Sequence, residues 1–331
     1  MKKQFIFSAL MAIGLIGQSV NAAETVQLDG SSTLFPVSEA MAEEFQKAQR
    51  GKIRVTVGVS GTGGGFKKFC RGETDATGAS RPIKAEEIEL CKKNGVEFLE
   101  LPIAMDALTV VINPNNDFID YLTVEELKKM WEPAAQDKVT NWNQIREGFP
   151  DLKLNLFGAG TDSGTYDYFT AAIVGKEHSS RGDFTASEDD NMLVQGVSND
   201  KRALGFFGLA YYEENKDKLK AVSISWKGKD PVAPGFDTAG DGRYQPLTRP
   251  LYYYASKSSV ANKEHVRKFM DFVLSESKTA PLVKEVGYVP LGAIVYKEAR
   301  RVLEELEVGT AYNGSEIGVD VVETLNRKKR Y

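Results

Sequence analysis

Short strand-like stretches alternate with amphipathic helical stretches in the first hundred residues after position 22. Residues 25–28 and 53–57 alternate apolar and polar side chains with the period of a half-buried strand. Residues 37–47, between them, carry apolar side chains at the spacing of one helix face. Strands that alternate with helices indicate parallel βαβ units, so the pattern predicts an α/β fold.

The rest of the chain continues this alternation. The β-branched run at residues 107–113 is typical of a central buried strand, and Thr123 and Glu126 form a capping box before a helix that ends at Trp131. Residues 228–250 are rich in Gly, Pro and Asp and predict a loop, while residues 327–331 predict a solvated tail. Further strands are expected at 74–79, 96–101, 152–157, 203–207 and 249–255, and further helices at 66–70, 86–93, 166–173, 191–199, 263–274 and 298–306.

The first 22 residues have the layout of a secretory signal peptide. Lys2 and Lys3 precede an apolar run at residues 5–17, and the small-residue ending Val20-Asn21-Ala22 follows it. A membrane anchor is the alternative, but the run is shorter than the ~20 residues that span a bilayer. We therefore expect residues 1–22 to be removed after Ala22 and the mature chain to be exported to the periplasm.

Composition and charge exclude several classes of function. The formal net charge is −4, and removal of two lysines with residues 1–22 makes it −6, whereas an extended nucleic-acid surface needs a basic balance. Two histidines are too few for a multi-histidine metal site, and two cysteines cannot form a four-thiolate zinc site. We expect no cofactor, no metal and no nucleic-acid partner.

The interpretation of the two cysteines, Cys70 and Cys91, depends on the predicted export of the chain. In an oxidising compartment an even number of cysteines favours a disulfide, and this one would close a short loop. The alternative is two buried free thiols.

Three strand–turn–helix elbows share one chemistry. They occupy residues 29–36, 60–65 and 158–165, and each turn is rich in Ser, Thr and Gly. Such a turn points free backbone N–H groups and hydroxyls from a helix N-terminus, where the helix dipole is positive. Any one elbow could be simple helix capping, but three in one chain favour binding of a small anion.

Arg81 and Ser163 are the side chains with the most specific candidate chemistry. Arg81 follows a predicted strand end, and its guanidinium suits bidentate contact with a tetrahedral oxyanion; a surface arginine is the alternative. Ser163 stands in Asp-Ser-Gly, which resembles a serine-protease motif, but a serine nucleophile needs a general base. His178 and His265 lie in no recognisable catalytic context, and we expect both at the surface.

Over about residues 24–326 the chain resembles the periplasmic phosphate-binding proteins of the high-affinity phosphate ABC transporter. The combination of motifs is specific, although each part alone is weak. The motifs are Asp29-Gly-Ser-Ser-Thr, Ser60-Gly-Thr-Gly-Gly-Gly, Ala79-Ser-Arg-Pro-Ile, Gly160-Thr-Asp-Ser-Gly-Thr-Tyr, Ser187-Glu-Asp-Asp-Asn, Gln195-Gly-Val and Ala203-Leu-Gly-Phe-Phe.

The resemblance implies a two-lobed type II periplasmic binding-protein fold with a central ligand cleft. Lobe 1 would hold residues 24–106 and 252–326, and lobe 2 residues 107–251. The chain would cross between the lobes near Val110 and Tyr252, and closure around the ligand would be a hinge motion.

The resemblance also implies a set of phosphate contacts. Family members in enterobacteria carry an acidic residue where Arg81 stands and an arginine where Ala159 stands, so the carboxylate that accepts the phosphate proton is open. Asp162 is our candidate acceptor, and charge stabilisation of a helix N-terminus is its alternative role. The implied contacts are Ser32, Thr33, the backbone N–H of Leu34, Ser60, Thr62, Ser163, Gly164 and Thr165.

The function implied is a monomeric, non-enzymatic receptor that captures inorganic phosphate and delivers it to permease subunits of an ABC transporter in the inner membrane. A receptor for another oxyanion, such as sulfate, molybdate or a phosphonate, is the first alternative. A secreted serine hydrolase that uses Ser163 is the second.

Overall fold

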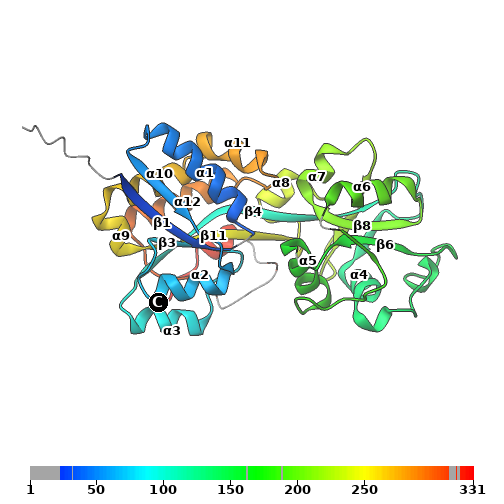
Figure 1. Ribbon diagram of the computed structural model, residues 1–331. Coiled ribbons are helices and arrows are strands. Elements are labelled where there is room, and N and C mark those ends of the chain that lie inside the picture. The colour runs from blue at the N-terminus through cyan, green and yellow to red at the C-terminus, as the bar shows by residue number, and fades with distance from the viewer. Residues whose placement is uncertain (1–22, 32, 162, 188, 313–317, 319–320) are drawn as a thin grey trace, which may run out of the picture.

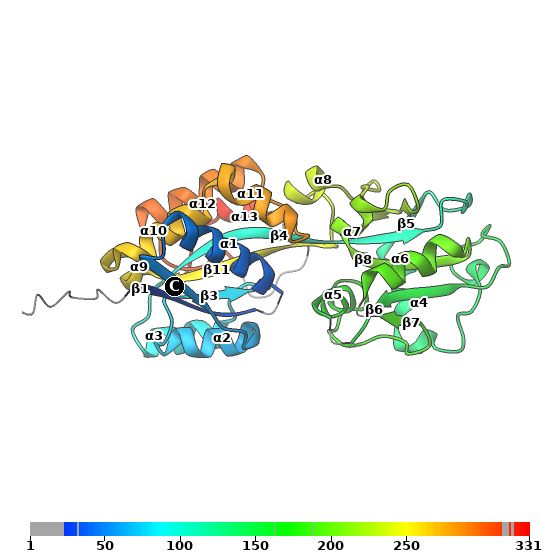
Figure 2. The same cartoon turned by 45° about the horizontal axis from the view of Figure 1, so that its top comes forward.

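The computed structural model describes residues 23–31, 33–161, 163–187, 189–312, 318 and 321–331. These residues form two lobes connected by the long strands β4 (Phe98–Ile112) and β11 (Thr248–Ser256), as Figure 1 shows. Figure 2 shows the same two lobes from a view turned by 45°. The two-lobed α/β architecture expected from the sequence is therefore confirmed.

Among the described residues, one nine-stranded sheet extends through both lobes. Its order is β2–β1–β3–β11–β4–β8–β6–β7, with β9 also paired to β4, and β5 pairs with β10 separately. The pairs of β1 with β2 and β3, and of β6 with β7 and β8, are parallel, as βαβ units require. The remaining strands are β1 (Glu24–Gly30), β2 (Ile53–Val57), β3 (Ala76–Ala79), β5 (Tyr121–Thr123), β6 (Asn155–Ala159), β7 (Thr185–Ser187), β8 (Ala203–Gly208), β9 (Lys220–Ala221) and β10 (Ser223–Ser225).

Helices cover both faces of this sheet, with α1, α10 and α12 on one face of lobe 1 and α2 and α3 on the other (Figure 1). Short 3₁₀ turns occupy Pro133–Ala135 and Trp142–Gln144, and a π-helical turn occupies Thr170–Val174. The α-helices are α1 (Phe35–Ala48), α2 (Gly61–Cys70), α3 (Ala85–Lys93), α4 (Val124–Trp131), α5 (Gly164–Phe169), α6 (Asp190–Asn199), α7 (Leu209–Glu214), α8 (Phe236–Gly240), α9 (Lys257–Asn262), α10 (Glu264–Val273), α11 (Glu276–Glu285), α12 (Ala293–Glu305) and α13 (Val321–Leu325). Within the described part of the chain, no helix has the length and apolar character needed to cross a membrane.

The long strand β4 corrects the prediction of two separate strands at 96–101 and 107–113. All 15 of its residues are buried, and it changes partner along its length. Residues 98–107 pair with β11, whereas residues 108–112 pair with β8. The continuity comes from these distant partners and not from a local pattern.

Two of the apolar cores separate at the same region. One cluster joins residues 26–104 to residues 251–303, and another lies wholly within residues 108–247. On β11, Tyr253 belongs to the core on one face of the sheet, whereas Tyr252 and Tyr254 belong to the core on the other face. The exact lobe boundaries stay a prediction.

Two local expectations were wrong. The predicted loop at 228–250 contains α8 and the start of β11. The predicted solvated tail packs against the molecule: the side chain of Lys329 is 3% exposed, and Arg330 exchanges two backbone hydrogen bonds of 2.8 Å with Thr310. At both positions the local structure depends on contacts between residues that are far apart in the sequence.

Cys70 and Cys91 form a disulfide with 21 residues of separation, which confirms the predicted pair. The bond ties the last residue of α2 to α3, on the face of lobe 1 opposite α1. It therefore braces the helix that begins at the second elbow.

Replacement of both cysteines by alanine should lower the free energy of unfolding by about 3 kcal/mol, because the unfolded chain loses a covalent constraint. Urea unfolding of the mature chain, with and without reductant, measures this. The double variant should be insensitive to reductant. An unchanged wild-type midpoint under full reduction would contradict a stabilising role for the bond.

Candidate functional site

A cleft of about 850 Å³ lies where the two lobes meet. Thr33, Thr62 and Arg81 line it from lobe 1, and Gly164 and Tyr168 line it from lobe 2. All three predicted elbows and the predicted arginine therefore border one common space, although they are spread over more than 130 positions of sequence.

The first elbow, between β1 and α1, depends on a glycine. Gly30 has a φ of +135°, and a Cβ added there would lie 2.2 Å from the carbonyl oxygen of Gly78. This close approach directs the chain so that Thr33 reaches the cleft. The hydroxyl of Tyr288 donates to the carbonyl oxygen of Thr33 at 2.6 Å and fixes the turn.

Leu34 differs in detail from what the resemblance implies. Its side chain is fully buried, and its N–H donates to the hydroxyl of Ser31 at 3.3 Å. In this conformation the N–H group already has an internal partner. Ser32 and Asp162, two other predicted site residues, lie outside the described residues.

The second elbow begins α2. Thr62 lines the cleft, and its hydroxyl lies 3.1 Å from the hydroxyl of Ser80. Ser60, at the helix N-cap, donates instead to the carboxylate of Asp29, which also forms an ion pair with Lys68 at 2.6 Å. Burial of Asp29 opposes its ionisation, but the hydrogen bonds from Lys68 and Ser60 outweigh burial and lower its pKa.

Arg81 lies in the cleft wall as a paired cation. Its two terminal nitrogens contact the two carboxylate oxygens of Glu87 at 2.8 and 2.9 Å, a bidentate arrangement. Burial opposes its charge, yet the hydrogen bonds to Glu87 and the negative charges of Glu87 and Glu177 raise its pKa. The predicted cation is thus present, with much of its charge balanced within lobe 1.

The third elbow brings lobe 2 against the first elbow. Gly164 lines the cleft, and a Cβ added there would lie 2.8 Å from the hydroxyl oxygen of Thr33. Ser163 caps α5, because its hydroxyl accepts from the N–H of Thr165 at 3.2 Å. Some predicted site residues of the described part of the chain belong to the elbows but do not line the cleft: Leu34, Ser60, Ser163 and Thr165. Their contacts with a ligand stay predictions.

The rim of the cleft in lobe 2 is a segment at residues 175–178. The ring of His178 is exposed there and lies 3.0 Å from a carboxylate oxygen of Asp167. Burial raises the pKa of Asp167, although the charges of His178 and Arg249 oppose this shift. His265, also expected at the surface, is instead largely buried on α10, 3.6 Å from Glu24.

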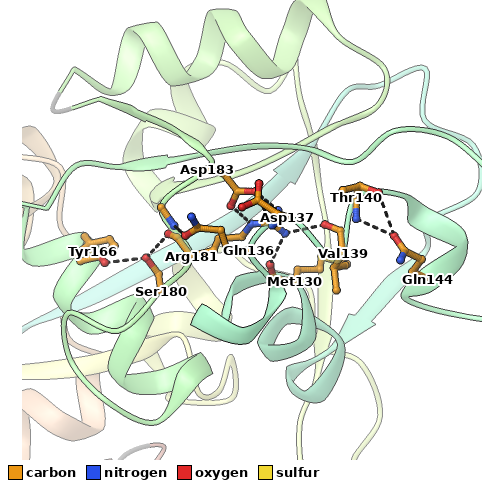
Figure 3. Close-up of polar contacts among 11 residues, drawn as sticks. Met130, Gln136, Asp137, Val139, Thr140, Gln144, Tyr166, Ser180, Arg181 and Asp183 are labelled. Atoms are coloured by element: carbon orange, nitrogen blue, oxygen red, sulfur yellow. Dashed lines mark hydrogen bonds and ion pairs between the residues drawn. The ribbon is translucent and has the colours of Figure 1, made fainter.

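A buried arginine anchors the rim segment. Figure 3 shows Arg181 with its guanidinium held by Asp183 and by the carbonyl oxygens of Met130 and Val139. Its side chain is 5% exposed, and its two bonds to Asp183 measure 2.5 and 2.6 Å. The hydroxyl of Ser180 in turn lies 2.8 Å from that of Tyr166 on α5, so the network joins the rim to the third elbow.

Sequence reasoning missed Arg249. This residue opens β11, lines the cleft, and forms an ion pair of 2.9 Å with Asp106 on β4. It also donates to the carbonyl oxygen of Gly164 at 3.4 Å, and its guanidinium carbon lies 4.4 Å from the ring centre of Tyr168. The one available signal was an arginine inside an apolar strand at a predicted lobe crossing.

Comparison with known proteins agrees with this geometry. Residues 18–277 match a family model described as a PBP superfamily domain. The chain belongs to the PBP superfamily. It is 50% identical to protein SphX of Synechococcus elongatus over 91% of this chain and 87% of that protein. It is also 35% identical to the phosphate-binding protein PstS of Staphylococcus saprophyticus, over 92% and 96% of the two chains.

A solved relative of this PBP superfamily chain has the same architecture. The crystal structure of a possible phosphate binding protein from Planctomyces limnophilus is 46% identical and superposes with a TM-score of 0.75. The match covers 86% of this chain and 99% of that one.

The Arg181–Asp183 pair generates a prediction about acid stability. The hydrogen bonds from Arg181, opposed by burial, lower the pKa of Asp183 from 3.8 to about 2. The pair therefore stabilises the folded state above pH of about 4, and this contribution is lost as the pH falls through about 2. Thermal unfolding from pH of about 6 to about 2 should show that Asp183→Asn is destabilised at the upper end and approaches wild type at the lower end.

Asp241→Asn is the matched control, because Asp241 pairs with Arg243 in solvent-exposed surroundings. Its unfolding temperature should differ little from that of the wild type at any pH. A constant deficit of Asp183→Asn across the pH series would contradict the proposed electrostatic contribution.

Proposed function

We propose that this chain is an extracytoplasmic receptor that captures inorganic phosphate and delivers it to the permease subunits of an ABC transporter. The observation that carries the proposal is the meeting of three Ser/Thr/Gly elbows and two arginines in one cleft between the lobes. The relative from Staphylococcus saprophyticus is named a phosphate-binding protein, and the solved relative from Planctomyces limnophilus a possible phosphate binding protein.

The features that favour an anion in the cleft are local hydrogen-bond donors and not the overall charge of the chain. The whole chain is acidic, with a formal net charge of −4, so its long-range field does not attract phosphate. The N-termini of α1 and α2 instead place helix dipoles and hydroxyls at the cleft. Fixed dipoles of this kind bind charge without the reorganisation that water would need.

Arg81 and Thr62 are two of the proposed oxyanion contacts, and their position in the cleft wall supports this assignment. Both line the cleft on lobe 1, and the hydroxyl and backbone N–H of Ser80 lie within 3.2 Å of the Thr62 hydroxyl. We include Ser32, Leu34, Ser60, Asp162, Ser163 and Thr165 in the proposed site on the strength of the family resemblance.

The hydrolase alternative receives no support from Ser163. Its hydroxyl oxygen accepts a backbone hydrogen bond at the start of α5. Of the two histidines, His178 is paired with Asp167, and His265 lies on α10 near Glu24. Within the described residues, no hydrogen bond links a histidine to Ser163, so a general base for a nucleophilic serine is not in place.

Calorimetry of the mature chain with phosphate, arsenate, sulfate and molybdate tests the proposal. Phosphate should bind more tightly than sulfate. Thr62→Val should weaken phosphate binding roughly 10-fold or more, because a hydrogen bond to a charged group is lost. Thr56→Val is the matched control, since Thr56 is exposed on β2 and does not line the cleft.

Tighter binding of sulfate or molybdate than of phosphate would replace the proposal by the other oxyanion function. Turnover of a phosphate or carboxylic ester that Ser163→Ala abolishes would replace it by the hydrolase function.

A further inference from the structure

Arg249 and Asp106 face each other at the point where the two crossing strands enter the cleft region. They are direct partners in the antiparallel register of β11 with β4. Both side chains are largely buried, with 14% of Arg249 and 10% of Asp106 exposed. The pair therefore lies on the hinge strands themselves and not on either lobe alone.

Three contacts fix the guanidinium of Arg249. Nε and Nη2 lie 3.0 and 2.9 Å from the same carboxylate oxygen of Asp106. Nη2 also reaches the carbonyl oxygen of Gly164, and the guanidinium plane lies over the ring of Tyr168. These contacts hold the group at the third elbow, on the lobe 2 side of the cleft.

The remaining terminal nitrogen, Nη1, has no hydrogen-bond acceptor among the residues that the structure describes, although Arg249 lines the cleft. Arg81 differs, because Glu87 engages both of its terminal nitrogens. Arg249 thus presents a preoriented, positively charged donor group to the cleft, whereas each terminal nitrogen of Arg81 already donates a hydrogen bond to Glu87.

We infer that the Nη1 group of Arg249 is a direct ligand of the bound anion at the base of the cleft, with Asp106 as the residue that positions it. The inference rests on the proposed phosphate function. A guanidinium held in this way offers a tetrahedral oxyanion a charge-assisted hydrogen bond at no cost in side-chain ordering. Because Arg249 stands on a hinge strand, the ligand would contact the strand about which the lobes close.

The alternative role of Arg249 is purely structural, as an ion pair that joins β11 to β4. The two roles differ in their dependence on the charge of the ligand. If the ion pair is only structural, its removal should weaken the binding of the phosphate dianion and monoanion equally. A cation in contact with the ligand favours the dianion, so its removal should flatten the rise of affinity with pH.

The experiment is phosphate calorimetry of the mature chain at pH of about 6 and about 8, a range over which phosphate gains its second negative charge. The test variant is Arg249→Met with Asp106→Asn, which removes the cation without leaving a buried carboxylate unpaired. Arg249→Lys, which keeps the charge but loses the planar fork, is the second variant should the double variant fail to fold. Arg243→Met is the matched control, since Arg243 is exposed and pairs with Asp241.

The double variant should bind phosphate roughly 30-fold or more weakly at pH of about 8, with a smaller loss at pH of about 6. Arg249→Lys, which keeps the positive charge, should lose more than threefold in affinity at both pH values, and Arg243→Met should match the wild type. A loss within about threefold for either test variant, or an equal loss at both pH values for the double variant, would overturn the inference while phosphate binding by the wild type stands. Failure of the wild type to bind phosphate would overturn the proposed function, and the inference with it.

Discussion

The antiparallel pairing of β4 with β11 is the constraint on which the rest of the structure depends. Nine residues of β4 between Phe98 and Ala107 pair with β11, with one shift of register between Leu251 and Tyr252, and every residue of β4 is buried. The same strand then continues into lobe 2 and pairs with β8. The two lobes therefore share a backbone ladder, and the cleft lies beside it. A shift of this register by one residue would place Arg249 and Asp106 on opposite faces of the sheet.

Each arginine in the cleft wall is matched by a carboxylate on an element of its own side. Glu87 on α3 balances Arg81, and Asp106 on β4 balances Arg249. An acidic chain can in this way keep buried cations close to an anion site, because the attraction of each paired carboxylate offsets part of the desolvation cost. Specificity then depends on the direction of the remaining N–H and O–H groups, which the elbows set.

The elements beside the cleft are braced separately in each lobe. In lobe 1 the disulfide joins α2, which starts at the second elbow, to α3, which carries Glu87. In lobe 2 the buried Arg181 ties the rim segment to α4 and, through Ser180, to α5 (Figure 3). Two internally braced lobes joined by a pair of strands are an arrangement that a hinge motion can use.

The sequence by itself determined the alternation of strands and helices, the helix cap at Thr123, the cysteine pair and the three elbows. These features depend on periodicity and turn chemistry within a few residues, which a single chain displays directly. Only the tertiary structure made β4 one strand, packed Lys329 and Arg330 against the body, and brought Arg249 to the cleft. Arg249 and Asp106 are 143 positions apart, and a contact of that range leaves no local pattern, because strand pairing and not sequence proximity creates it.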